Sequence, residues 1–261
     1  MTAVLRSEWT KLRTVRSTTW SMLLLLALTV GFGAVLAAGS DTDANVAGGG
    51  PGDNDIVRDS LVGIYVGQFA VVAFATLAIT SEYATRTILA TFAAVPRRGA
   101  VLVAKATLVA GTVLAVSLVA STTAFVLGQH LLRDGGVAPP AYPEWTLADG
   151  PAQRAVLGSA LFLTALALLS LGVGTIFRNG AATISTLLAL LFVPLVAAPL
   201  LPEQAREIVQ RVTPGAGFAV QQTVERTDAL PIGPWAGLGV TFAWAGAALV
   251  VALWLIRRRD A

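Results

Sequence analysis

Residues 155–202 read AVLGSALFLTALALLSLGVGTIFRNGAATISTLLALLFVPLVAAPLLP, and Arg178 is the one charged side chain among them. The charge-free runs on either side of it are each long enough to cross a hydrocarbon core, which takes roughly 20 helical residues. A spanning segment must satisfy its backbone polar groups internally, so both runs are expected to be helical. Only RNG joins them, which predicts a tight turn and an antiparallel helical hairpin.

The rest of the chain has the same apolar character. Of its 261 residues, 55% are hydrophobic and 13% are charged, whereas soluble domains carry roughly 25% charged residues. A charge at mid-bilayer costs about 2.5 to 3.5 kcal/mol, so six charge-free runs are a strong membrane signal. We therefore predict an all-α integral membrane protein, a single transmembrane domain over residues 1–261. Its six spans are expected at about 18–38, 61–80, 101–127, 155–177, 181–201 and 234–256.

The basic residues predict the orientation. Six spans place both termini on one side, and that side carries 12 of the Lys and Arg residues against 6 on the other. Loops rich in Lys and Arg stay in the cytoplasm, so we expect a multi-pass protein of the plasma membrane with both termini cytoplasmic. The pI near 9.8 reflects this topology and contact with cytoplasmic lipid better than it suggests binding of nucleic acid. No nucleic-acid partner is expected, because no basic face carries stacking aromatic residues.

Residues 1–17 have the pattern of a helix that lies in the membrane interface. Leu5, Trp9 and Leu12 recur at helical spacing, and basic residues surround them. Such a helix places its apolar face at the acyl boundary of the lipid and its cations at the headgroups. A simple basic anchor for the first span is the alternative interpretation.

Residues 202–233, between the last two spans, are long and less polar than a loop requires. EQAREIVQRVTP, from residue 203, has Ile208, Val209 and Val212 on one side of a helix and charged residues on the other, and GAGFAV then returns to apolar character. A helix that dips back against the outer membrane face and a loop with one exposed helix both fit this pattern.

No motif for chemistry of its own is present. The chain lacks a G-x-x-x-x-G-K-[ST] loop, and its two lysines, Lys11 and Lys105, lie outside any glycine-rich segment. The single histidine, His130, lies at the edge of an outer loop, so neither an H-E-x-x-H motif nor a Ser-His-Asp site can be built within the membrane. We therefore expect no enzymatic site, no cofactor and no metal. Lys105 lies near an inner span end, where it is expected to extend to the interface.

One connection on the cytoplasmic side interrupts the apolar pattern. Residues 81–100 read SEYATRTILATFAAVPRRGA. On a helical wheel, the apolar face of this stretch consists of Ile88, Phe92 and Val95. Its polar face consists of Glu82, Arg86 and Thr87. Proline disfavours helix at the residue before it, so a short amphipathic helix from Glu82 to Pro96 is predicted. A loop helix that rests on the membrane with its arginines at the headgroups fits the composition as well.

Residues 81–106 resemble the cytoplasmic coupling region of the ABC type-2 exporter permeases. There a glutamate precedes a Thr-Ile/Leu helix, followed by proline, a basic pair and a lysine that opens the next span. The matching residues are Glu82, Thr87, Ile88, Pro96, Arg97, Arg98 and Lys105. Residues 5–20 are similar to the family's N-terminal interfacial helix, so the resemblance covers essentially the whole chain. Actinobacterial-type members often have glycine where this chain has Arg86.

The resemblance implies a permease subunit of an ATP-driven exporter. Two permease chains, identical or different, would assemble with two separate ABC ATPase subunits, which would bind ATP and Mg. The coupling helix would lie in a cleft of the ATPase, and its movement would tilt the second and third spans to export a small amphipathic compound. The residues implied at that contact are Glu82, Tyr83, Arg86, Thr87, Ile88, Phe92, Pro96, Arg97 and Arg98.

Two other functions fit the same sequence. One is export of a lipid-linked compound or a polysaccharide by the same architecture, and the other is a noncatalytic membrane scaffold or immunity protein. A neighbouring reading frame with a P-loop and an ABC signature would favour an exporter over a scaffold. Uncharged polar residues within the spans could line a path or bond helix to helix, which leaves the substrate open: Gln68, Thr76, Ser121 and Thr122.

The predicted topology can be tested with single cysteines, because the chain has none of its own. Gly49→Cys and Arg258→Cys are expected to react from opposite sides of the membrane, since an odd number of spans separates them. The measurement is labelling of intact cells by an impermeant thiol reagent. Labelling of both positions from outside would contradict the six-span arrangement.

Overall fold

The computed structural model describes residues 2–14, 16–39, 55–88, 91, 98–135, 144–224 and 229–259. These residues form helices and connections without strands. Six segments are long and apolar enough to span a membrane, which confirms the predicted all-α membrane fold. They are Arg16–Ala38, Ile64–Ala84, Gly99–Asp134, Gly150–Phe177, Gly180–Leu200 and Pro234–Arg258.

Short elements flank or interrupt these spans. The first span consists of α2, a wider π-helical turn η1, and α3. In chain order the elements are α1 (Thr2–Thr14), α2 (Arg16–Leu26), η1 (Ala27–Gly31), α3 (Phe32–Ala38), α5 (Ile56–Ser60), α6 (Ile64–Ala84), α8 (Arg98–Asp134), α9 (Gly150–Phe177), α10 (Gly180–Ala197), η2 (Ala198–Leu200), α11 (Glu203–Val212), η3 (Pro214–Gln221) and α12 (Pro234–Arg259).

The predicted hairpin between α9 and α10 is present. Helix α9 ends where Arg178 adopts a left-handed conformation with φ of 55°, and its N–H still bonds the carbonyl of Gly174. The Asn179 side chain then accepts a hydrogen bond of 3.0 Å from the N–H of Ala182. That bond caps the first turn of α10. RNG therefore reverses the chain with one left-handed residue and one helix cap.

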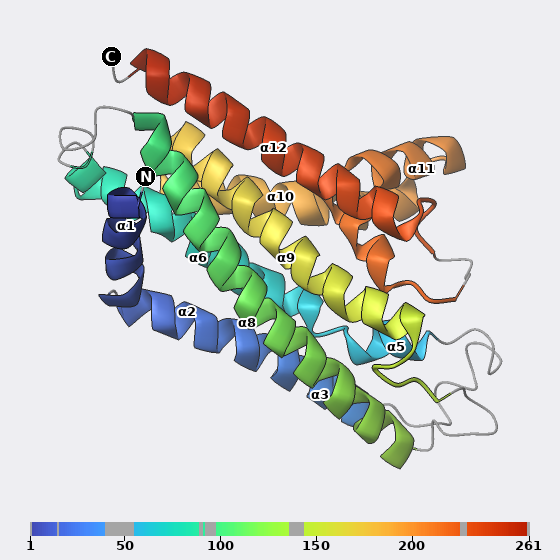
Figure 1. Cartoon of the computed structure of the whole chain (residues 1–261). Helices are drawn as coiled ribbons and strands as arrows, with labels where there is room; N and C mark the ends of the chain where they lie inside the picture. The colour runs from blue at the N-terminus through green and yellow to red at the C-terminus, as the bar shows by residue number, and fades with distance from the viewer. Residues whose placement is uncertain are drawn as a thin grey trace.

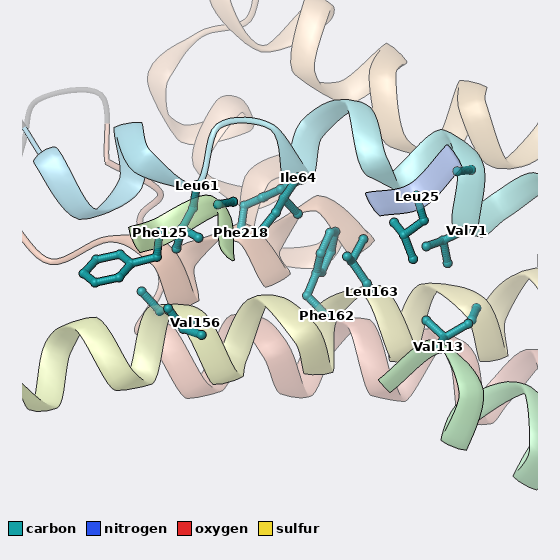
Figure 2. Packing of buried hydrophobic residues seen from close by; sticks show 14 of the residues in the cluster. Leu25, Leu61, Ile64, Val71, Val113, Phe125, Val156, Phe162, Leu163 and Phe218 are labelled. Atoms are coloured by element: carbon teal, nitrogen blue, oxygen red, sulfur yellow. The ribbon is translucent and has the colours of Figure 1, made fainter. Parts of the chain in front are cut away.

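Helix α9 lies at the centre of the bundle (Figure 1). It packs against α6, α8, α10, α12 and η3. Of its most apolar 18 residues, 78% are buried, whereas only 22% are buried in the corresponding stretches of the spans formed by α10 and by α12. Its Phe162 and Leu163 face the apolar side chains of neighbouring helices, as Figure 2 shows. The outer spans keep apolar side chains exposed, as expected where lipid rather than water is the surrounding medium.

Both termini lie at one end of the bundle (Figure 1). We call this end, which carries α1, the connection from α6 to α8 and the end of α12, the terminal face. The other end, which carries α5 and α11, is the opposite face. The two ends have different polar contacts, which are described below.

The segment between the last two spans turns back into the bundle. Helix α11 contains no buried residue, whereas six consecutive residues of η3, from Ala216 to Gln221, are buried between α9 and α12. The Phe218 ring stacks on Tyr65 at a centroid distance of 3.9 Å. Of the two expected arrangements for residues 202–233, the structure has an exposed amphipathic helix followed by a buried re-entrant turn.

The π-helical turn η1 in the first span packs against a glycine, Gly63. Thr29, within η1, is fully buried, and a Cβ on Gly63 would collide with its carbonyl. The π turn therefore seats the first span directly on the backbone that leads into α6. Sequence periodicity gave no sign of this turn, because residues 27–31 are all uncharged and fit an α-helix equally well.

Several spans extend beyond their expected bounds, among them α9, which begins at Gly150, and α12, which ends at Arg259. Helix α6 continues past Thr80 to Ala84, and α8 continues past Leu127 to Asp134. The added turns contain polar side chains that bond within the protein. The Ser81 hydroxyl donates to the carbonyl of Leu77, and the Gln129 amide donates to the Ser60 hydroxyl at 2.9 Å. Hydropathy marks where a helix leaves the apolar core, not where it ends.

The fit of η3 can be tested with two glycines of α12. A Cβ on Gly237 would collide with the Ala216 carbonyl, whereas Gly239 has open space. Gly237→Ala is therefore expected to lower the thermal unfolding temperature in detergent. Gly239→Ala should leave it unchanged or raise it slightly, because alanine favours helix over glycine by about 1 kcal/mol. Equal behaviour of the two variants would mean that η3 does not pack closely on α12.

Candidate functional site

The connection between the second and third spans is not the single helix from Glu82 to Pro96 that the sequence pattern predicts. Glu82 and Tyr83 form the last turn of α6, which ends at Ala84. Arg86 then has a φ of 58°, a left-handed conformation that cannot continue a right-handed helix. Arginine does not disfavour helix, so the pattern could not reveal this break. Glycine, which the resemblance of residues 81–106 leads one to expect at this position, suits this conformation.

The predicted contact residues differ in exposure. Thr85, Arg86 and Thr87 are exposed and form the described tip of the connection. Ile88 is only 4% exposed and packs within the chain against Val101 and other apolar residues of the terminal face. Its side chain is therefore not available to a partner in this conformation.

The remaining predicted contact residues are only partly placed. Phe92, Pro96 and Arg97 lie outside the described residues. Arg98 begins α8, but its side chain is outside the described part of the chain.

A cluster of four charged side chains lies directly beneath this connection. Both lysines of the chain and two glutamates form it, and we call it the junction cluster: Glu8, Lys11, Glu82 and Lys105. Three helices contribute to it, since α1 provides two members and α6 and α8 one each. The cluster therefore joins the N-terminal helix to both spans that flank the connection.

Lys105 is the centre of the junction cluster. Its ammonium nitrogen lies 2.6 Å from Oε2 of Glu8 and 3.0 Å from Oε1 of Glu82. Glu8 is 2% exposed and Lys105 3% exposed, so this is a buried ion pair. The expectation that Lys105 extends to the interface was wrong, because two carboxylates from other helices neutralise it inside the protein.

Lys11 closes the junction cluster from the outer side. Its ammonium nitrogen lies 2.6 Å from Oε1 of Glu8 and 3.1 Å from Oε1 of Glu82. It also donates a hydrogen bond of 3.3 Å to the Thr91 hydroxyl. The cluster thus reaches the connection itself as well as the helices before and after it.

The environment favours the charged forms of two cluster members. Burial alone raises the pKa of Glu8, but the attraction of Lys105 and Lys11 outweighs it, and the net pKa lies below its ordinary value. Burial alone lowers the pKa of Lys11, but contacts with Glu8 and Glu82 outweigh it, and the net pKa is raised. Glu8 is therefore a carboxylate and Lys11 an ammonium at neutral pH.

The predicted N-terminal helix is present as α1, while its position in the membrane interface stays a prediction, and its buried face differs from the expectation. Leu5 and Leu12 are half-buried, and Trp9 is 50% exposed. Glu8, between them, is the residue that points inward. The spacing of Glu8 and Lys11 by three residues was the available signal, yet it predicts only a local pair on one helix.

A second polar anchor lies at the opposite face. Asp55 is fully buried and accepts hydrogen bonds of 2.6 Å from both the N–H and the hydroxyl of Thr223. It also caps α5 by accepting from the N–H of Arg58. This anchor fixes the chain just after η3 to the start of α5. Sequence reasoning missed it, because both segments have the composition of loops.

The uncharged polar residues of the spans mostly bond locally. Ser121 donates to the carbonyl of Ser117 in its own helix, and Gln68 donates to that of Tyr65. Gln68 also lines a cavity of about 130 Å³ near the opposite face, together with Arg58 and Phe218. Among the described residues, no group of three or more His, Asp or Glu side chains could hold a metal.

Six apolar helices long enough to cross a bilayer place this chain in the class of multi-pass helical membrane proteins. Comparisons with family models, with curated proteins and with solved structures found no match to this chain. Its function must therefore be argued from the site itself and from the resemblance of residues 81–106.

The contribution of the junction cluster can be measured by removing its central cation. Lys105→Met leaves Glu8 and Glu82 buried with Lys11 alone, which is expected to lower the free energy of unfolding by about 3 to 5 kcal/mol. Arg133→Met is the matched control, because its partner Glu144 is exposed and surface pairs contribute about 0 to 1 kcal/mol. Thermal unfolding in detergent, followed by tryptophan fluorescence, provides the comparison. Equal losses would show that burial adds nothing to the cluster.

Proposed function

We propose that this chain is the transmembrane permease subunit of an ATP-driven ABC exporter that moves a small amphipathic compound out of the cell. A separate ATPase subunit binds ATP and Mg, and a second permease chain completes the assembly. The protein resides in the plasma membrane with its terminal face in the cytoplasm, which follows from the distribution of Lys and Arg.

The observation that carries this proposal is the attachment of the connection between α6 and α8. Its exposed tip, Thr85 to Thr87, is continuous with α6, and Ile88 packs it against α8. The junction cluster then ties both helices to α1. A loop that only rests on lipid needs no such attachment.

The attachment suits the transmission of force. A push on the tip acts on both spans at once, because the ion pairs and the packing of Ile88 resist independent movement of either helix. In this proposal Arg86 and Thr87 contact the ATPase, and Ile88 holds the tip in place. Glu82 positions Lys105 and does not contact the partner.

In this proposal ATP hydrolysis belongs to the partner subunit, which is consistent with the lack of a phosphate-binding loop in this sequence. A noncatalytic scaffold would carry the same spans, but it would not alter the rate of a partner ATPase. Stimulated hydrolysis is thus the readout that separates the two functions.

The proposal is tested by purifying the chain with an ABC ATPase from a neighbouring reading frame. The chain alone should hydrolyse no ATP, whereas the complex should be stimulated by its transported compound. Arg86→Glu combined with Thr87→Glu should weaken ATPase binding about tenfold. The double substitution changes the charge of the tip from positive to negative, and the tip then no longer complements the surface of the partner. Arg257→Glu is the control, since Arg257 is also exposed at the terminal face but lies on α12.

Cross-linking gives a second readout at the same positions. Thr87→Cys should join the ATPase in the assembled complex, and Arg257→Cys should not. Full stimulation in the Arg86/Thr87 variant, or equal cross-linking at both positions, would exclude this tip as the coupling contact. Absence of any stimulation in the wild-type complex would favour a scaffold.

A further inference from the structure

Two hollows meet at the bend between α1 and α2. The larger, about 510 Å³, is bounded by α1, α2, α6 and α8 beside the junction cluster. The smaller, about 290 Å³, adjoins it, because Leu12 and Thr18 line both. Their combined size is within the range of ligand sites in proteins.

The larger hollow offers polar groups for a ligand. Lys11, which lines it, keeps 38% of its side chain exposed despite its two ion pairs. The hydroxyls of Ser17, Thr18 and Ser21 also line it, and none of them has a hydrogen bond to another residue in the described part of the chain. The three hydroxyls can donate to the oxygens of an anion, whereas the ammonium of Lys11, which already donates to Glu8, Glu82 and Thr91, contributes its charge.

The smaller hollow is mainly apolar. Met22, Leu23 and Leu26 of the first span line it, and Leu23 is 50% exposed. A hydrocarbon chain that follows α2 would cover these side chains. The two hollows together therefore match a molecule with a polar head and an apolar tail.

The charges around the hollows favour an anionic head. Lys11, Lys105 and Glu82 line the larger hollow, and Glu8 balances the second lysine, so the junction cluster as a whole is neutral. Arg13, which lines the smaller hollow, supplies the net positive charge of the site. Basic pockets at a membrane surface attract anionic lipid headgroups for this reason.

We propose that the bend between α1 and α2 is a binding site for one anionic phospholipid of the adjacent leaflet. The phosphate lies in the larger hollow at Lys11 and the hydroxyls of α2, and an acyl chain lies along Met22, Leu23 and Leu26. The bound lipid holds α1 against α6 next to the junction cluster. The site is independent of the proposed export function, since it needs neither an ATPase nor a cargo.

The test measures lipid binding to the purified chain in detergent micelles by native mass spectrometry. Dioleoylphosphatidylglycerol should bind with a stoichiometry of one and about tenfold more tightly than dioleoylphosphatidylcholine, whose headgroup has no net charge. Glycerol phosphate, which lacks acyl chains, should not bind at the same concentrations.

A steric variant tests the location of the lipid. Thr18→Phe places a ring where both hollows meet and should weaken phosphatidylglycerol binding about tenfold. Thr107→Phe is the control, because Thr107 is exposed on α8 near the same face and lines neither hollow. The double variant Ser17→Ala/Ser21→Ala removes two hydroxyls with little change in side-chain volume. It therefore tests the contribution of the hydroxyls even if the ring of Thr18→Phe perturbs folding.

Several outcomes would overturn the proposal. One is equal binding of phosphatidylglycerol to wild type, Thr18→Phe and Ser17→Ala/Ser21→Ala. Another is equal affinity for the two phospholipids, which would leave only a nonspecific apolar groove. Binding of glycerol phosphate as tight as that of the lipid would assign the site to a small soluble anion. Loss of the lipid in Thr18→Phe and its retention in Thr107→Phe would support the site.

Discussion

The buried pairing of Glu8 with Lys105 is the interaction on which the terminal face depends. Removing a carboxylate and an ammonium from water is unfavourable, and their attraction offsets that penalty only when the geometry is close and further bonds satisfy the remaining atoms. Here the contact is 2.6 Å, and Glu82 and Lys11 provide the further bonds. The pairing joins residues that are nearly a hundred positions apart in the chain. It therefore specifies how α1 lies against the spans far more narrowly than apolar contact could.

The two faces of the bundle are held together by different means. At the terminal face, charge pairs connect three helices around an exposed tip. At the opposite face, Asp55 binds a neutral hydroxyl and backbone N–H groups, and η3 fills the space between α9 and α12. Phe218 of η3 packs against Phe162 of α9 in the apolar core (Figure 2). Within the bundle, distant segments are also joined by hydrogen bonds between neutral groups, such as the bond of 2.9 Å from the Gln221 amide to the Ser159 hydroxyl.

The sequence was sufficient for the fold because lipid selects segments by composition alone. Each of the six charge-free runs became a span, and RNG became the turn between α9 and α10. The helix ends were harder, since Ser81 and Gln129 are polar yet bond within the protein. Lys105 was misplaced because a single lysine near a span end usually extends to water. Its partners Glu8 and Glu82 are close to it only after three helices have packed. Arg86 interrupts the helix through a left-handed backbone conformation, which cannot be predicted from an arginine side chain.

The π turn in the first span has an evolutionary consequence. A π turn accommodates one residue more than an α-helical turn, so an insertion in a helix is absorbed locally and not passed along it. Thr29 occupies this turn and rests on Gly63, which keeps α2 and α3 in separate helical registers. Insertions or deletions of single residues in one half of the span can therefore be accepted while the other half keeps its contacts. The turn therefore separates α2, which follows the junction at the start of the chain, from α3.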